Sequence, residues 1–398
     1  MGIFANPLTD LLEYEDFSRD FLKGTDPVGM TGCIDSEKVH FMSTFLGEKK
    51  VQLVVTYNEQ RAREIEEDYK LFCSQVYVIP PRDLIFFSAD LQGNAIIAER
   101  MKAFAALYQN EAKVIITTMD ALMSAAVPFE QLMSHVIKLK EGDELDLEKL
   151  KHDLTVMGYE RVGRVEEPGQ FTVHGGIADV YPLTMEVPVR IELWGDEIDT
   201  IRCFEPQSQR SMDQIECVSV FPAAEVIADD TARRRAVGMI QNELESQLAV
   251  FKKAKEPDKA KRLREETNRI LEALGEDVVL EAPDSYISYF YPRTVQLSEY
   301  FDEKNTLVFL DEPMRLKERG DGVQAEFEES MKNRLEQGFL LPGQTALLTP
   351  AKHVLAAFER GQVAALSSLD SRLADFTVVN SYAVNVQNMN TYLSLIHI

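Results

Sequence analysis

The chain has 398 residues, with 66 Asp and Glu against 42 Lys and Arg, which gives a formal net charge of −24 at pH 7. This balance excludes a protein that holds DNA by charge over most of its surface, because an acidic surface repels the phosphate backbone. A hydrophobic content of 45% over this length predicts two or three buried cores. No apolar run reaches the length of a membrane span, and the mixed, acidic start does not resemble a secretory signal.

The cysteines indicate the cellular compartment, and the histidines argue against a metal site. The four cysteines, Cys33, Cys73, Cys203 and Cys217, lie far apart and form no C-x-x-C pair. This usage favours reduced thiols, so we expect a cytoplasmic protein. The six histidines show no ligand spacing, and we expect no metal site.

The first 136 residues predict an α/β domain. From about residue 27, short runs rich in β-branched residues at 51–57, 75–81 and 112–123 alternate with helical stretches at 58–72 and 98–108. Strands of this kind, separated by helices, are typical of a parallel sheet that is covered on both faces. We therefore assign residues 1–136 to the first part of a parallel α/β domain.

The stretch GMTGCIDS, at positions 29–36 between a loop and a predicted helix, is close to a phosphate-binding loop. Such a loop follows G-x-x-x-x-G-K-[ST], in which glycines let backbone N–H groups surround phosphates and the lysine neutralises them. Gly29, Gly32 and Ser36 fit a nucleotide site, but Ile34 replaces the second glycine and Asp35 replaces the lysine. A carboxylate here repels phosphate, so the stretch is either a degenerate nucleotide site or a chance spacing.

A second candidate for the same site follows a predicted strand at 307–310. Asp311 and Glu312 end this strand, in the form of the acidic motif that positions Mg²⁺ in nucleotide-driven motors. A strand that merely ends in two acids is the alternative.

From residue 137 to 222 the pattern changes to an acidic helix followed by short strands and turns, which predicts an inserted β-rich α+β domain. The segment VPVRIELWGDEIDTIRCF predicts a hairpin that turns at Gly195-Asp196. Period two places Arg190 and Trp194 on the face away from the core, and it places His174 likewise in an earlier strand. In the alternative, another layer of the domain covers Trp194 and Arg190 only stacks on it.

Residues 223–350 are expected to complete the α/β domain. They contain a predicted helix pair at 231–275 that breaks near Pro257 and has apolar rows facing the core. Residues 229–270 hold 11 Lys and Arg against 8 Asp and Glu, which favours a solvated helix pair over a nucleic-acid patch, because the signs alternate.

We expect the last part of the chain to belong to a different domain, and its final residues to have a different origin. We assign residues 351–392 to the truncated start of a further α/β domain. The final residues 393–398, LSLIHI, are what a transposon-end sequencing adapter encodes, so we interpret them as an artefact and expect the natural chain to continue.

Several stretches resemble one family: EEPGQFTVHGGIADVYPLTMEVPVRIELWGDEIDTIRCFEPQSQRS, FPAAEVI, LVFLDEP and QGFLLPG. They are similar to the UvrB-homology module at the N-terminus of bacterial transcription-repair coupling factors (Mfd). The likeness covers roughly residues 11–342 and is most specific at 169–211. It implies that GMTGCIDS and Asp311-Glu312 are relics of a nucleotide site, and that this part of the chain is not an enzyme. It also implies that the tyrosine-rich hairpin with which UvrB probes damage is absent from the connection at 80–100.

The resemblance further implies a role in recruiting UvrA for nucleotide excision repair. The family's UvrA-contacting residues fall on His174, Arg190 and Trp194, with His174 in place of an arginine. ATP, Mg²⁺, RNA polymerase and double-stranded DNA would belong to downstream parts of the full-length translocase. For this chain we expect no cofactor, no membrane contact and a monomer. The alternatives are an ATPase with a variant phosphate loop and a nucleic-acid-binding module built on the basic helices.

Overall fold

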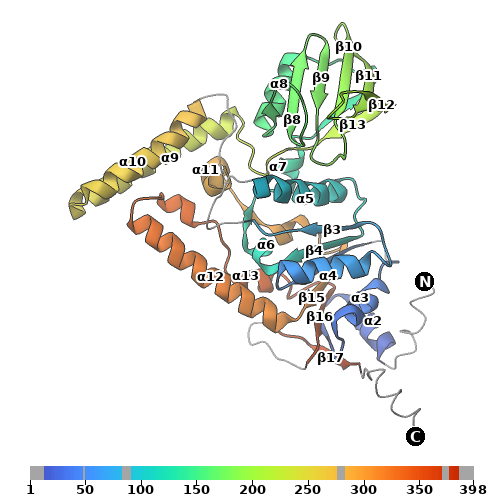
Figure 1. The fold of residues 1–398 in the computed structure, drawn as a ribbon. Coiled ribbons are helices and arrows are strands. Elements are labelled where there is room, and N and C mark those ends of the chain that lie inside the picture. The colour runs from blue at the N-terminus through green and yellow to red at the C-terminus, as the bar shows by residue number, and fades with distance from the viewer. Residues whose placement is uncertain (1–12, 48–49, 83–90, 276–282, 370–375, 385–398) are drawn as a thin grey trace.

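The computed structural model describes residues 13–47, 50–82, 91–275, 283–369 and 376–384. Its largest element is a sheet of seven parallel strands in the order β17-β1-β16-β15-β2-β4-β3 (Figure 1). The strands are β1 (Val28–Thr31), β2 (Val51–Thr56), β3 (Val76–Ile79), β4 (Val114–Thr118), β15 (Thr306–Asp311), β16 (Val363–Ser367) and β17 (Asn380–Ala383). The predicted parallel α/β domain is therefore confirmed.

Helices cover both faces of this sheet, which explains why its strands are apolar without alternation. The helices α2 (Tyr14–Lys23), α3 (Asp35–Ser43) and α4 (Glu59–Tyr69) pack on one face, and α5 (Leu91–Tyr108), α6 (Met119–Met123), α12 (Pro313–Glu336) and α13 (Ala351–Ala356) pack on the other. Within β2, Val54 joins the first core, whereas Leu53 and Val55 join the second. The sheet thus separates two large hydrophobic cores.

The end of the described chain corrects one sequence prediction. We expected residues 351–392 to begin a further domain, but β16 lies between β1 and β15 inside the same sheet, and β17 extends that sheet beyond β1. The prediction failed because neighbours in a parallel sheet can be distant in sequence, and strand order leaves no local pattern. Residues 393–398, which we interpret as adapter-derived, lie outside the described residues, as do residues 83–90 of the connection compared with the UvrB hairpin.

A second, six-stranded sheet is inserted between the two parts of this domain, in the order β12-β11-β10-β9-β8-β7. The elements of the insert are β6 (Ile137–Lys140), α8 (Leu147–Val156), β7 (Glu160–Arg161), β8 (Gln170–His174), β9 (Ile177–Val180), β10 (Val189–Trp194), β11 (Glu197–Phe204), β12 (Ser211–Gln214) and β13 (Cys217–Val220). Leu150 and Leu154 of α8 pack on one face of this sheet, against Phe171 and Ile191. The entering strand β6 pairs with the leaving strand β13, so the insert begins and ends side by side.

Buried ion pairs fix the chain where it leaves the insert. Glu225 follows β13 and accepts hydrogen bonds from Arg100 of α5, with a distance of 3.0 Å from Nη2 to Oε2. Arg82 lies 3.7 Å from the same carboxylate. Burial alone would raise the pKa of Glu225, but the two guanidinium groups lower it below its usual value. The carboxylate is therefore held ionised, and it ties the insert to the body.

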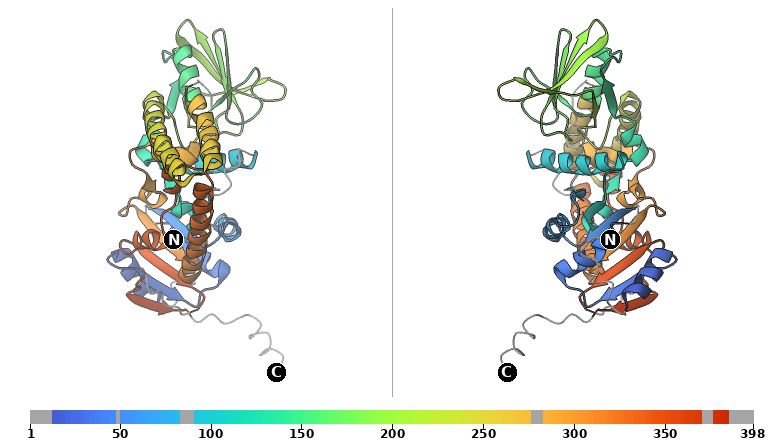
Figure 2. Two further views of the ribbon diagram at one scale, coloured as in Figure 1. Left: turned by 90° about the vertical axis from the view of Figure 1, so that its left-hand side faces the viewer. Right: turned by 90° about the vertical axis from the view of Figure 1, so that its right-hand side faces the viewer.

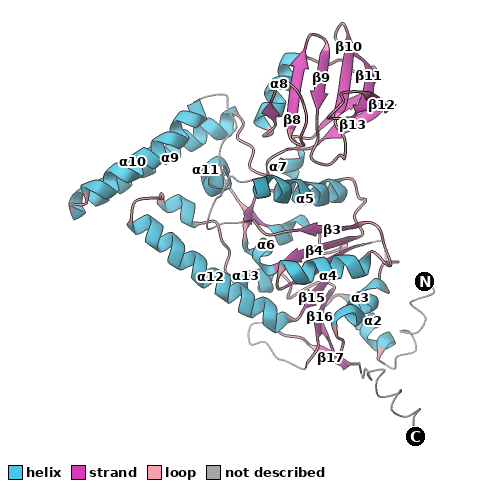
Figure 3. Cartoon of the chain, viewed as in Figure 1, coloured by secondary structure: helices cyan, strands magenta, loops and turns pink. Residues whose placement is uncertain are grey.

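The helices α9 (Asp230–Ala254) and α10 (Pro257–Gly275) form a hairpin that projects from the body (Figure 1), and the left view of Figure 2 shows the two helices side by side in front of the body. The predicted break at Pro257 is confirmed, and the apolar rows are buried at Ile240, Leu263 and Ile270. The remaining short elements are β5 (Ala125–Ala126), α7 (Phe129–Met133), η1 (Pro283–Tyr286), α11 (Ile287–Phe290), β14 (Val295–Gln296), η2 (Leu297–Tyr300) and η3 (Pro342–Thr345) (Figure 3). Among the helices formed by described residues, none has the length and apolar character needed to cross a bilayer.

Candidate functional site

The face of the inserted sheet opposite α8, here called the outer face, brings the three predicted partner-binding residues together. Cross-strand pairing aligns Thr172, Asp179, Arg190 and Arg202 in one row, and His174, Ile177, Glu192 and Thr200 in the next. Trp194 follows at the end of β10, opposite Glu197. His174, Arg190 and Trp194 thus share one surface, although they come from two separated strands.

Trp194 extends into solvent from the end of β10. Its exposed fraction is 83%, the highest among the large hydrophobic residues in the described part of the chain. The predicted turn at Gly195-Asp196 is confirmed, and Gly195 has a φ of 66°, which a glycine adopts without strain. Ile177, which is 40% exposed, lies diagonally across from Trp194. The alternative in which another layer covers the indole is therefore wrong.

Arg190 is held in place rather than free. Its Nε donates to Asp179 Oδ1 at 2.8 Å and its Nη2 donates to Asp179 Oδ2 at 2.7 Å. The guanidinium carbon lies 4.8 Å from the ring centre of Phe204, so the group stacks on Phe204 and not on Trp194. The hydrogen bond to Asp179 raises the pKa of Arg190 further above its usual value. The side chain remains 21% exposed, so part of the guanidinium is accessible.

His174 is exposed at the end of β8, on the same side as the indole. Its Nε2 lies 2.9 Å from the hydroxyl oxygen of Thr172, and the tautomer decides which of the two groups donates. A ring held by a neighbouring hydroxyl offers fewer donors than the arginine that the family resemblance would place there.

The sequence analysis missed Arg202, the cross-strand neighbour of Arg190. Within the described residues, Arg202 has no ion pair, and its Nε is buried without a hydrogen-bond partner. Period two along EIDTIRCF could have indicated it, because Arg202 and Thr200 are two residues apart and therefore lie on one face. Because Asp179 already pairs with Arg190, the two neighbouring arginines keep one uncompensated positive charge, which favours a negatively charged group opposite them.

The segment GMTGCIDS differs from a phosphate-binding loop in its geometry as well as in its residues. We expected it to follow a loop, but its first three residues lie in β1, and a connection of three residues, 32–34, leads to α3. A Cβ on Gly29 would lie 2.9 Å from Val378, and one on Gly32 would lie 2.1 Å from the Val384 carbonyl oxygen. The glycines thus admit the neighbouring strand β17 and its continuation.

Asp35 and Ile34 point outward at the start of α3. The side chain of Asp35 is 85% exposed, and Ile34 is 51% exposed. The Ile34 N–H donates to Glu37 Oε2 at 3.3 Å, so a carboxylate of the chain occupies an amide that a phosphate-binding loop would use. Ser36 is the second residue of α3.

Asp311 and Glu312 are engaged by a lysine that the sequence analysis did not single out. Lys38 of α3 is buried, and its Nζ lies 2.7 Å from Asp311 Oδ1 and 2.6 Å from Glu312 Oε1. Arg61 Nε lies 3.4 Å from the second oxygen of Asp311. These four residues, here called the ion-pair cluster, balance two positive charges against two negative ones.

Further hydrogen bonds complete the ion-pair cluster. The Thr56 hydroxyl donates to Asp311 Oδ2 at 2.9 Å, and the Ser368 N–H donates to Glu312 Oε1 at 2.8 Å. Burial tends to raise the pKa of Glu312, but the hydrogen bonds from Lys38 and Ser368 outweigh it and lower that pKa. The cluster therefore lies at the carboxyl ends of β2, β15 and β16, where parallel sheets commonly bind ligands, and it is internally satisfied.

Comparisons with known proteins agree with the resemblance. The family model of the UvrB interaction domain matches residues 137–225, which contain the whole outer face. A transcription-repair-coupling factor of Bacillus subtilis is 30% identical over 342 residues, which cover 84% of this chain and 29% of that protein. The chain is homologous to the N-terminal part of transcription-repair-coupling factors.

Other transcription-repair-coupling factors match over the same share of their length. The one from Staphylococcus epidermidis is 30% identical over 348 residues, which cover 86% of this chain and 29% of the relative. The one from Staphylococcus haemolyticus is 30% identical over 334 residues, which cover 82% of this chain and 28% of the relative. The chain thus spans less than a third of the length of these relatives.

Proposed function

We propose that this chain is a non-catalytic interaction module that recruits UvrA in nucleotide excision repair through the outer face. The exposure of Trp194 carries the proposal, because an indole left in water at the end of a rigid strand is the kind of residue that becomes an interface hot spot. It lies inside the region that matches the UvrB interaction domain. We further propose that the chain acts as a monomer in the cytoplasm.

The fixed position of Arg190 supports the same proposal. Asp179 and Phe204 hold the guanidinium before any partner arrives, so binding would cost little side-chain entropy. Arg202 adds a second positive charge beside it. We therefore propose that the partner presents an apolar pocket to Trp194 and acidic groups to the two arginines.

The decisive experiment measures UvrA capture by purified variants of this chain. We expect Trp194→Ala to weaken binding by about 2 kcal/mol, roughly 30-fold, and Arg190→Ala to weaken it as well. Leu71→Ala is the matched control, because Leu71 is 78% exposed but lies on the body after α4. Unchanged capture by both outer-face variants would disprove the assignment.

We propose further that the ion-pair cluster excludes nucleotide. Lys38 is the one buried lysine near the relic loop among the described residues, and two carboxylates already neutralise it. Calorimetric titration with ATP and Mg²⁺ should therefore give no heat of binding. Micromolar binding would contradict the proposal and favour an ATPase with a variant site.

The activities of the full-length relatives are a separate proposal. We place ATP-driven translocation on duplex DNA, and displacement of RNA polymerase, in the part of the relatives that this chain does not span. UvrA capture by this chain should then need neither ATP nor DNA. A strict requirement for either one would contradict this division of roles.

A further inference from the structure

The tip of the α9–α10 hairpin carries a local charge opposite to that of the whole chain. Residues 252–264 contain seven Lys and Arg against two acids, whereas the chain as a whole has a net charge of −24. Figure 1 shows the two helices projecting from the body, and near the tip Arg262 donates to the Gln337 carbonyl oxygen at 2.9 Å, just after α12. The sign alternation noted in the sequence therefore does not extend to the tip.

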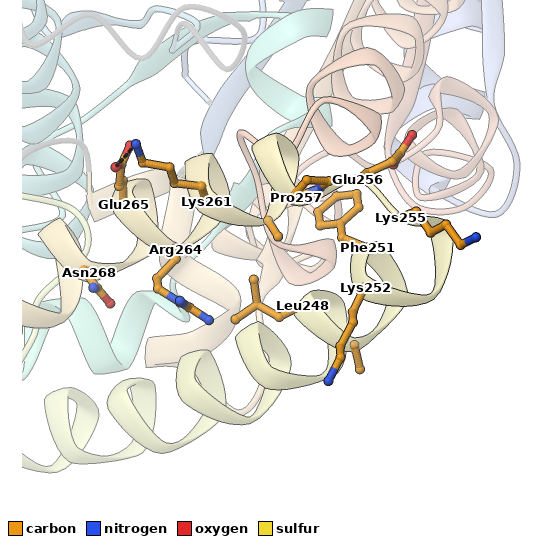
Figure 4. Close-up of a pocket in the computed structure, with 12 residues that line it drawn as sticks. Leu248, Phe251, Lys252, Lys255, Glu256, Pro257, Lys261, Arg264, Glu265 and Asn268 are labelled. Carbon is orange, nitrogen blue, oxygen red and sulfur yellow. Dashed lines mark ion pairs between the residues drawn. The ribbon is translucent and has the colours of Figure 1, made fainter.

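A groove of about 560 Å³ lies between the two helices near this tip (Figure 4). Leu248 and Phe251 of α9 contribute apolar lining, and four basic and two acidic residues line it as well. Figure 4 shows Arg264 pointing from α10 toward α9, while Lys252 and Lys255 extend outward from the end of α9. The groove thus combines an apolar floor with a basic rim.

Most of the positive charge on this rim is not neutralised. The two acids that line the groove pair with other lysines: Glu256 lies 2.9 Å from Lys259, and Glu265 lies 3.8 Å from Lys261. Lys252, Lys255 and Arg264 form no ion pair with any residue that the structure describes. All three are exposed, so their charge acts on the solvent in front of the groove.

Helix stability accounts for only part of this arrangement. Lys252 and Lys253 lie in the last turn of α9, where cations interact favourably with the helix dipole. Arg264 is well inside α10 and Lys255 lies beyond the end of α9, so this explanation does not apply to them. Lys255 also adopts a left-handed conformation, with a φ of 60°, which glycine tolerates better than lysine.

We propose that the hairpin tip binds the phosphate backbone of duplex DNA without reading its sequence. Unpaired, closely spaced cations on a projecting element match a line of phosphates, and binding would release counterions. A duplex is favoured over a single strand because single strands need exposed aromatic rings for stacking. At this tip Phe251 is buried, and Phe339, which is 45% exposed, is stacked by Arg262, whose guanidinium carbon lies 4.6 Å from the ring centre.

The first test uses a variant that separates charge from folding. Lys255→Gly removes one cation and relieves the left-handed backbone strain, so we expect its Tm to rise while its affinity for DNA falls several-fold. Fluorescence anisotropy with a short labelled duplex measures the affinity at about 50 mM salt. A variant that is more stable and binds DNA as tightly as the parent chain would overturn the role of Lys255.

The second test measures the salt dependence of three cations together. If Lys252→Gln, Lys255→Gln and Arg264→Gln each remove one phosphate contact, the slope of log K against log salt should fall by about 2.7. The parent chain should then lose roughly 40-fold more affinity than the triple variant between about 50 and 200 mM salt. The control combines Lys70→Gln, Lys113→Gln and Lys304→Gln, which changes the net charge equally at exposed sites on the body.

Three outcomes would overturn the proposal. The first is the absence of DNA retention at low salt, and the second is an equal loss of affinity in the control triple variant. The third is that poly-glutamate displaces the labelled duplex as well as unlabelled DNA does at the same concentration of negative charges. The last result would show that the tip does not distinguish DNA phosphates from acidic protein surfaces. None of these outcomes bears on UvrA capture, which is measured through Trp194 on a separate sheet.

Discussion

The outer face and the ion-pair cluster are both rich in charge, but their side chains are satisfied in different ways. In the cluster, Lys38 pairs with both Asp311 and Glu312; the lysine and Asp311 are buried, and Glu312 is 17% exposed. On the outer face, Trp194 is left 83% exposed and Arg190 is held in position but not covered. Because groups already satisfied within a chain have little to gain from a ligand, we propose that the cluster serves stability and that the exposed Trp194 serves recognition on the outer face.

The strongest test of this contrast removes the buried lysine. Lys38→Met should lower the free energy of unfolding by about 3–5 kcal/mol, because two carboxylates then lose their main buried counter-charge. Denaturant unfolding measures the loss. Lys70→Met is the control, because Lys70 forms a surface ion pair with Glu66 of α4. The loss of that pair should lower the free energy of unfolding by less than about 1 kcal/mol.

A second variant distinguishes the loss of this ion pair from nonspecific destabilisation of the fold. Adding Glu312→Gln to Lys38→Met removes one of the unpaired charges and should recover part of the lost stability. A Lys38→Met protein as stable as the parent chain would contradict the structural role of the cluster.

The next largest effect should be a loss of binding affinity without a loss of folding stability. Trp194→Ala should leave the free energy of unfolding within about 0.5 kcal/mol of the parent, because the indole makes few contacts within the chain. The same variant should lose about 2 kcal/mol of UvrA affinity. Paired denaturation and capture measurements check both halves, and a comparable loss of stability would mean that the indole supports the fold.

Lowering the pH should reduce the stabilisation that the ion-pair cluster gives to the fold, whereas Trp194 has no group that titrates. The pKa of Glu312 is lower in the folded chain than its usual value of about 4.5, so the ionised form stabilises the fold at neutral pH. This contribution is present above the usual pKa and is lost as the pH falls through the lowered one. Unfolding measured across that range should show a smaller pH dependence for Glu312→Gln than for the parent chain.

The smallest expected change concerns His174. His174→Arg should leave UvrA capture equal or up to several-fold stronger, because a guanidinium keeps its charge near neutral pH and offers more donors. Capture measured at one pH and one salt concentration is sufficient. A clear loss of binding would show that the imidazole itself makes a specific contact.

Local patterns predicted much of the fold. The run at 51–57 became β2, and the run at 112–123 became β4 followed by the helix α6. The alternation around Arg190 placed Arg190 and Trp194 away from the core, and their neighbours Val189 and Ile191 are buried. Period two likewise predicted an outward Trp194. These successes concern features set by neighbours in the chain, namely side-chain periodicity and turn residues.

The failures concern contacts between distant segments. Nothing near Lys38 indicates that it will meet Asp311, 273 positions away, and a lysine in a helix is usually solvated. The bond from Arg190 to Asp179 depends on the register of two strands, which a single sequence does not specify. The place of β16 inside the sheet failed for the same reason.

The position of β1 has a consequence for how the protein is made. Val28 pairs with Ala364 on one side and with Asn380 on the other, so this early strand finds its neighbours only after the ribosome has translated some 336 further residues. At ordinary elongation rates that interval is roughly 20 s to a minute. Throughout it the strand has no native partner in the sheet, so the order of the strands leaves both of its edges open to wrong pairing while the rest of the chain is made.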